Sequence, residues 1–98
     1  MRFYHFKGGE HFEFEAHIFA HNDDRAGELF FIQSLLNEQS DYQMIWRELD
    51  PDEFDEPERT WLYRALALNV EGVACRDTDG LWLPMPPSIS RDRPPDET

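Results

Sequence analysis

Alternating aromatic and polar residues at the start of the chain predict two β-strands. Residues 3–6 and 11–20 are rich in β-favouring aromatic side chains, and a glycine-containing segment, residues 8–10, separates them. A three-residue loop would pair Phe6 with Phe12 and form a hairpin. In that register Tyr4, Phe6, Phe12 and Phe14 share one face, and His5, Lys7, His11, Glu13 and Glu15 share the other.

Helical spacing of apolar residues follows the hairpin, and one more strand comes after it. Asn22 and the acids behind it provide an N-cap and a negatively charged first turn for a helix over about residues 24–37. The apolar set of this helix is wider than one sheet contact requires, so we expect an uncovered flank that includes Phe31 and Leu35. Alternating apolar residues then predict a third strand over residues 42–49.

A second helix is predicted from about residue 56 to residue 70, after Asp50-Pro51 has ended the third strand. Asp55 and Glu58 have the spacing of a capping box, with Asp55 as the cap. Gly72 suits the left-handed position that often follows a helix C-terminus. The sequence therefore predicts both ends of this helix.

A second hairpin and a proline-rich tail complete the pattern. Residues 73–76 and 81–83 are short apolar strands around Asp79-Gly80, which favours a tight turn. Five of the fifteen residues from 84 to 98 are proline, so we expect a flexible tail after a compact domain over residues 1–83. The element order is ββαβαββ. We expect an α+β fold in which two helices cover one face of a mostly antiparallel sheet.

The composition of the 98-residue chain limits its partners and its location. Nine Lys and Arg residues against twenty-one Asp and Glu residues give a net charge of −12, which repels phosphate backbones and anionic membranes. We therefore expect neither direct nucleic-acid binding nor membrane binding. No apolar run approaches the roughly 20 residues of a membrane span and no signal peptide is recognisable, so a cytoplasmic location is expected. Cys75 is the only cysteine and is expected as a core thiol.

The sequence contains no recognisable catalytic or cofactor-binding motif, so we predict a non-enzymatic protein that needs no cofactor. A metal site is an alternative, because side chains of His5, His11 and Glu13 could converge from the two strands of the first hairpin. Successive positions on one face of a strand lie about 7 Å apart, so one strand alone cannot supply the ligands. A solvated polar face is the simpler interpretation, and we assign no metal.

The most acidic stretch of the chain is residues 48–58, called the acidic segment below. Its seven negative charges approach the linear charge density of a nucleic-acid backbone. Helix capping would explain four of these acids, at Asp50, Asp55, Glu56 and Glu58, and it leaves a surplus at the other three. We therefore predict a partner-binding surface formed by Glu48, Asp50, Asp52, Glu53, Phe54, Asp55, Glu56 and Glu58.

The short chain, its charge and the acidic segment together resemble the small acidic proteins that phages and mobile elements use against host nucleic-acid machinery. DNA mimics and anti-CRISPR proteins belong to this class. The resemblance implies an inhibitor that binds a basic protein surface, namely the nucleic-acid-binding groove of a host nuclease or surveillance complex, with Phe54 as an aromatic anchor. The alternative is a self-associating adaptor or regulatory protein, a homodimer held by the uncovered flank of the first helix or by an unpaired strand edge.

Overall fold

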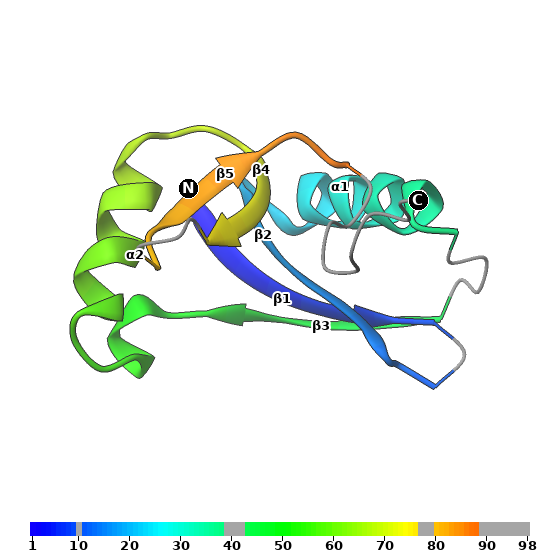
Figure 1. Ribbon diagram of the computed structural model, residues 1–98, viewed down its shortest axis with the longest axis horizontal. Coiled ribbons are helices and arrows are strands. Elements are labelled where there is room, and N and C mark those ends of the chain that lie inside the picture. The colour runs from blue at the N-terminus through cyan, green and yellow to red at the C-terminus, as the bar shows by residue number, and fades with distance from the viewer. Residues whose placement is uncertain (10, 39–42, 77–79, 89–98) are drawn as a thin grey trace, which may run out of the picture.

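The computed structural model describes residues 1–9, 11–38, 43–76 and 80–88, which fold into one sheet and two helices (Figure 1). The elements in chain order are β1 (Arg2–Gly8), β2 (Phe14–Ala20), α1 (Asp23–Leu36), β3 (Met44–Leu49), the 3₁₀ turn η1 (Pro51–Glu53), α2 (Glu58–Ala67), β4 (Gly72–Arg76) and β5 (Trp82–Met85). The α+β class, the element order and the antiparallel sheet expected from the sequence are confirmed.

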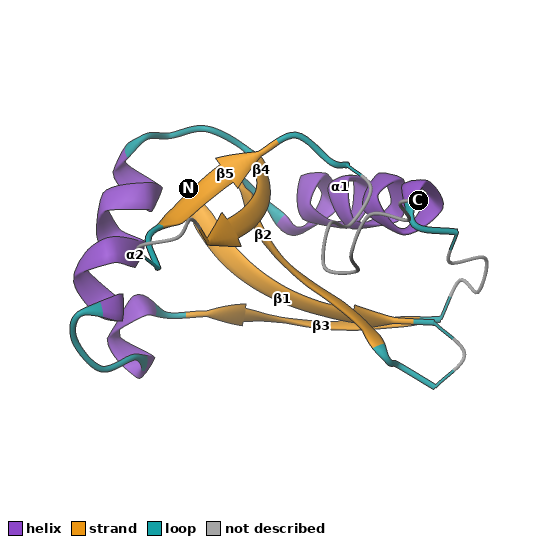
Figure 2. Ribbon diagram, viewed as in Figure 1, coloured by secondary structure: helices purple, strands orange, loops and turns teal. Residues whose placement is uncertain are grey.

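The five strands follow the order β3-β1-β2-β4-β5, and every neighbouring pair is antiparallel. β1 and β2 occupy the middle of the sheet, while β3 and β5 form its edges (Figure 2). The link between the two halves is short, because β2 and β4 pair only through Ile18 with Val73 and Phe19 with Gly72. The second hairpin is present as expected, although residues 77–79 of its turn lie outside the described part of the chain.

The register of the first hairpin differs from the prediction. Tyr4 pairs with Ile18 and Phe6 with Ala16, so the strands are displaced by four residues from the expected pairing. The cause is a longer turn: the Phe12 N–H donates to the Gly9 carbonyl at 3.2 Å, and Phe12 has a φ of 57°. Because strand side chains alternate with a period of two, an even displacement keeps the residues of β1 and β2 on their expected faces. Residues 11–13, expected at the start of the second strand, instead precede β2.

The two helices pack on opposite faces of the sheet, so the expectation that both cover one face is wrong. Neighbouring strand residues Phe3 and Tyr4 belong to different buried clusters, as do Ile18 and Phe19. Since adjacent strand positions point to opposite faces, β1 and β2 need apolar cover on both sides. The cluster under α1 contains Tyr4, Phe6, Ile18, Ala20, Ala26, Leu29, Phe30 and Val73. The cluster under α2 contains Phe3, Phe19, Leu49, Leu62, Ala65 and Trp82.

The start of α1 forms as expected, because the Asn22 side chain accepts a hydrogen bond from the Arg25 N–H at 2.9 Å. On its flank Phe31 and Leu35 are exposed, as expected. Two polar residues of α1, Gln33 and Ser34, are buried instead. The position of Gln33 is explained by the segment after β5, which returns across this helix.

The ends of α2 are built from other residues than those predicted. The helix starts at Glu58, Pro57 at its N-cap makes no side-chain hydrogen bond, and the expected Asp55 cap does not form. Beyond its C-terminus Asn69, with a φ of 58°, takes the left-handed conformation that we expected at Gly72. Gly72 is instead the first residue of β4.

The segment after β5 contacts the body of the protein. β5 runs to Met85, past the expected domain boundary at residue 83. The Ser88 N–H then donates to Gln33 Oε1 at 2.8 Å, and Asn37 Nδ2 donates to the Ser88 carbonyl at 3.0 Å. These two bonds hold the chain against α1. The remainder of the expected tail, residues 89–98, lies outside the described residues.

Two further expectations concern the membrane and Cys75. No helix within the described residues is long and apolar enough to cross a membrane. Cys75 is exposed, so its expected place as a core thiol is wrong. Its neighbours in β4 explain this: Val73 points to the α1 face near the sheet centre, whereas Cys75, two residues further along the same face, lies beyond the covered area.

Gly72 and Gly27 provide a matched pair for testing the β4–β5 contact. A Cβ atom at Gly72 would lie 2.6 Å from the Met85 carbonyl oxygen, whereas one at Gly27 would meet no atom within 4 Å. We expect Gly72→Ala to lower the free energy of unfolding by about 1–3 kcal/mol through overpacking. Gly27→Ala should raise it by about 0.5–1 kcal/mol, because glycine is unfavourable inside a helix. Urea unfolding measures both, and shifts of the same sign would contradict the packing described here.

Candidate partner-binding surface

The acidic segment forms a tight corner between β3 and α2. The Asp50 side chain accepts a hydrogen bond from the Asp52 N–H at 3.0 Å, and Glu53 Oε2 accepts one from the Asp50 N–H at 3.0 Å. This reciprocal pair is a capping box on η1. The backbone N–H of Asp50 and the nearby guanidinium of Arg47 lower the pKa of the Glu53 carboxyl. The capping box that we predicted at the start of α2, with Asp55, is therefore found on η1, with Asp50.

Four of the seven carboxylates in the acidic segment form ion pairs with arginines. The pairs are Glu48 with Arg2 at 3.8 Å, Glu53 with Arg47 at 3.1 Å, Glu56 with Arg59 at 3.8 Å, and Glu58 with Arg76. Seven acids less four arginines leave a net charge of −3 on this surface. The pairs are solvent-exposed and add little stability, but they reduce the negative field that a partner meets.

The remaining acids differ in how far the fold uses them. Asp52 accepts a hydrogen bond from the Tyr63 hydroxyl at 2.6 Å, and this bond raises the pKa of Tyr63. Glu56 receives the N–H of Thr60 at 3.1 Å and its hydroxyl at 2.6 Å, so Glu56 serves the first turn of α2. The Asp55 side chain is exposed and forms no hydrogen bond or ion pair with the described residues. Asp55, which we expected to be a cap, is thus the least engaged acid.

Phe54 connects the acidic segment to the core under α2. Its ring is partly buried against that cluster, with its centroid 6.2 Å from that of Phe3. Its carbonyl accepts a hydrogen bond from Arg59 Nε at 3.0 Å. The aromatic ring therefore anchors the corner to its own protein, and only its exposed part is accessible to a partner.

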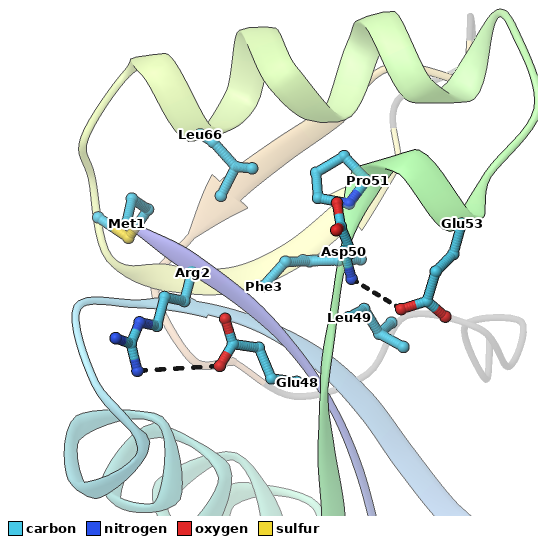
Figure 3. A pocket seen from close by; sticks show the side chains of 9 residues that line it. All are labelled: Met1, Arg2, Phe3, Glu48, Leu49, Asp50, Pro51, Glu53 and Leu66. Carbon is cyan, nitrogen blue, oxygen red and sulfur yellow. Dashed lines mark hydrogen bonds and ion pairs between the residues drawn. The ribbon is translucent and has the colours of Figure 1, made fainter.

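A pocket of about 510 Å³ lies beside the acidic segment, between the start of β1, the end of β3 and α2 (Figure 3). Its polar rim is formed by Arg2, Glu48, Asp50 and Glu53, and its apolar lining by Met1, Phe3, Leu49, Pro51 and Leu66. Three of the predicted partner-binding residues, Glu48, Asp50 and Glu53, thus meet at one hollow. Carboxylates beside an apolar lining are suited to a cationic side chain with a long aliphatic stem.

The polar face of the first hairpin does not assemble the expected metal ligands. The displaced register places His5 opposite His17, so His5 and Glu13 do not pair. His5 Nε2 instead lies 2.7 Å from Glu15 Oε1, and the His5 and His17 rings stack with centroids 4.5 Å apart. Within the described residues no group of three or more His, Cys, Asp or Glu side chains is arranged to hold a metal ion.

His17 is the most perturbed residue of that face. Burial, together with the neighbouring His5, lowers the pKa of His17 to about 4, so its ring is neutral at pH 7. The ring lies 5.3 Å from the centroids of both Phe3 and Trp82. The imidazole therefore behaves as part of the core under α2.

A polar cluster around Glu71 was not predicted, because its members lie about fifty residues apart in the chain. Glu71 accepts hydrogen bonds from the His21 N–H and from Arg25 Nε, each at 3.0 Å. These bonds, with the His21 ring 2.9 Å away, lower the pKa of the Glu71 carboxyl to about 2. The cluster joins the end of β2, the start of α1 and the start of β4, which is a structural role.

Comparison with protein-family models, with curated proteins and with solved structures finds no match to this chain. The candidate surface is therefore judged on its own contacts and charges. Those contacts divide the acidic segment into acids that shape the corner, such as Asp50 and Glu53, and acids that the fold does not use, such as Asp55.

Asp50 and Asp55 test this division. Asp50→Ala removes the η1 cap and should lower the free energy of unfolding by about 1 kcal/mol. Asp55→Ala should change it by less than about 0.5 kcal/mol, as is usual for an exposed position outside such a feature. Chemical denaturation of both variants measures the difference. Equal effects would show that Asp50 has no special capping role.

The pKa of His17 predicts a pH dependence of stability. The folded pKa is about 4 and the ordinary value is 6.5, so between these values the unfolded chain takes up a proton that the folded chain does not. Wild-type stability should be constant above pH 6.5 and should fall on acidification, by about 1–2 kcal/mol at pH 5. His17→Phe keeps an aromatic ring in the stack and should lose this decrease. Urea unfolding at pH 7.5 and pH 5 compares the two proteins, and an unchanged decrease in the variant would refute the assignment.

Proposed function

We propose that this protein is a non-enzymatic, acidic binding protein that occupies a basic surface of a nucleic-acid-binding partner. The observation that carries the proposal is the pocket, which is lined by the acidic residues Glu48, Asp50 and Glu53 together with apolar residues. Asp52 and Asp55, both exposed, extend the negative surface beyond the pocket. In keeping with the class that the sequence resembles, the partner would be a host nuclease or surveillance complex and the outcome its inhibition.

The binding mechanism follows from the looseness of one ion pair. Arg2 and Glu48 are 3.8 Å apart and both side chains are about half exposed. Replacing Arg2 beside Glu48 by a basic side chain of the partner therefore costs little free energy. A lysine or arginine of the partner can place its aliphatic stem on Met1 and Leu66 and its cation beside Glu48. The acidic chain then competes with a nucleic acid for the same basic groove.

In this proposal charge attracts the partner, but it does not imitate the regular row of phosphates of a nucleic acid. The net charge of −3 on the acidic segment steers a basic partner toward it, and added salt screens that attraction. Specific recognition then depends on the pocket and on Asp52 and Asp55, rather than on a regular row of charges. Association should therefore be fast at low salt and weaker at high salt.

A second candidate function, self-association, is favoured by the exposed apolar side of α1. Phe31, Ile32, Leu35 and Leu36 are between 40% and 50% exposed. They lie in the last two turns of the helix, and residues 29–37 contain no acid. Helices that are apolar all round are normally covered, so this side of α1 supports an adaptor or regulatory protein that works as a homodimer.

Charge-neutral variants test the first proposal. We would combine Glu48→Gln, Asp52→Asn and Asp55→Asn, and compare them with a control of equal charge change, Asp24→Asn with Glu28→Gln and Glu38→Gln. The tagged wild-type chain first isolates its partner from host extract. The purified partner should lose bound nucleic acid when the wild type is added. The variant with three neutralised acids of the acidic segment should displace it about tenfold less well, which is 1.4 kcal/mol.

The control variant and salt complete this experiment. The control should displace nucleic acid as the wild type does, because its charges lie away from the pocket. Raising salt from 50 to about 200 mM should weaken the wild-type complex. If both variants displace nucleic acid equally poorly, the effect depends only on the overall charge and not on the acidic segment. A partner without nucleic-acid-binding activity would reject the proposal.

A further inference from the structure

The edge strand β3 is open along one side. Among the described strands it pairs only with β1, and five of its six residues are exposed. Its large apolar residues Met44, Ile45 and Trp46 are 40% to 53% exposed. The other edge, β5, has only four residues and contains Pro84, which cannot donate a backbone hydrogen bond to a further strand. β3 has no such protection.

β3 is also the place where a second copy of a strongly acidic chain meets least repulsion. The chain carries a net charge of −12, yet residues 43–47 contain no acid and one arginine, and the next residue, Glu48, is ion-paired with Arg2 at 3.8 Å. The guanidinium of Arg47 is held by Glu53, so this stretch is close to neutral. Exposed apolar side chains without like charges favour contact between identical chains.

We propose that two copies of this protein pair through β3, antiparallel, and join their five-stranded sheets into one continuous sheet. The inference rests on the second of the two functions proposed above and places the contact on β3 instead of on α1. A two-fold axis perpendicular to the sheet relates the copies, so the backbone groups on the open side of each β3 satisfy those of the other.

The pattern of residues along β3 selects one register. In a two-fold antiparallel pair, opposite residues must point to the same face, so the axis must pass through a residue position. An axis at Trp46 pairs residues 44–48 and places Trp46 opposite its own copy and Ile45 opposite Arg47. An axis at Arg47 would oppose two arginines, and an axis at Ile45 would pair only three residues of β3. The register centred on Trp46 is therefore favoured.

Trp46 is well placed for this contact. Its ring lies 5.8 Å from the centroid of Tyr4 and 6.0 Å from that of Phe6. These two buried rings of β1 hold the indole in place, while nearly half of the Trp46 side chain stays exposed. Phe30 of α1 also stacks on Phe6, at 5.0 Å. Trp46 and α1 therefore lie on the same side of the sheet. In the joined sheet the two tryptophans would meet between the two copies of α1.

Light scattering and sedimentation equilibrium of the full chain test the pairing. The wild type should have twice the mass of one chain, and its dimer should tighten with added salt because both copies are negative. Ile45→Lys places a lysine opposite Arg47 of the other copy and should weaken the dimer at least about tenfold. Leu83→Lys adds the same charge at an exposed site on the opposite edge, β5, and should leave the dimer unchanged. Circular dichroism confirms that both variants fold.

A third variant separates this inference from the function on which it rests. If Leu35→Lys, on α1, dissociates the dimer and Ile45→Lys does not, self-association stands and the β3 contact is rejected. If the wild type is monomeric at every concentration up to its solubility limit, both are rejected. A dimer that weakens as salt is added would also contradict a contact between two acidic chains.

A cysteine cross-link tests the register. In a Cys75→Ser background, Trp46→Cys places two thiols directly opposite each other, within reach of a disulfide. Mild oxidation should give a covalent dimer, whereas Leu83→Cys in the same background should not. A dimer that persists without cross-linking overturns the register. Loss of the dimer in a folded Trp46→Cys chain supports the contact, because it places Trp46 in the interface.

Discussion

The structure depends on the burial of both faces of β1 and β2. Phe3 and Tyr4 are adjacent in the chain and almost fully buried, yet they point to opposite sides of the sheet, and Ile18 and Phe19 repeat this arrangement on the next strand. Two central strands of this kind require a cover on each side. The two helices supply these covers, one per face, and the sheet becomes the middle layer of the molecule.

This arrangement has a consequence for the edges of the sheet. A chain of 98 residues has two helices in its described part, and both are used over the central strands. β3 receives little cover, and the outer side of α1 receives none from the sheet. The exposed apolar residues of both elements thus result from the same constraint. Met44 and Trp46 lie on the same side of the sheet as α1, whereas Ile45 points to the other side.

The acidic segment has a structural role in this architecture. Asp50 and Glu53 make the turn that brings the chain from β3 to α2, and Phe54 fixes that turn to the core. Four arginines form ion pairs with four of its seven acids. Glu48, Asp50 and Glu53 line the pocket, whereas Asp52 and Asp55 are exposed outside it.

The sequence by itself determined the local features of this protein. Asn22 caps α1 through its own side chain, alternating apolar residues mark the strands, and the wide apolar set of α1 predicted its uncovered flank. Each of these features depends on residues within a few positions of one another. The α+β class and the element order follow from them. The acidic segment is likewise a local feature, because its charges follow one another within eleven residues.

Only the tertiary structure decided how these elements combine. The register of β1 and β2 depended on the turn at Phe12, whose positive φ no pattern in the sequence requires. The faces taken by the helices, the exposure of Cys75 and the bonds of Glu71 all depend on residues far apart in the chain. Of the two expected caps, Asp50 caps η1 and Asp55 does not cap α2, because η1 forms where β3 leaves the sheet. Local propensity does not determine where β3 stops pairing with β1, since the two strands are distant in the sequence.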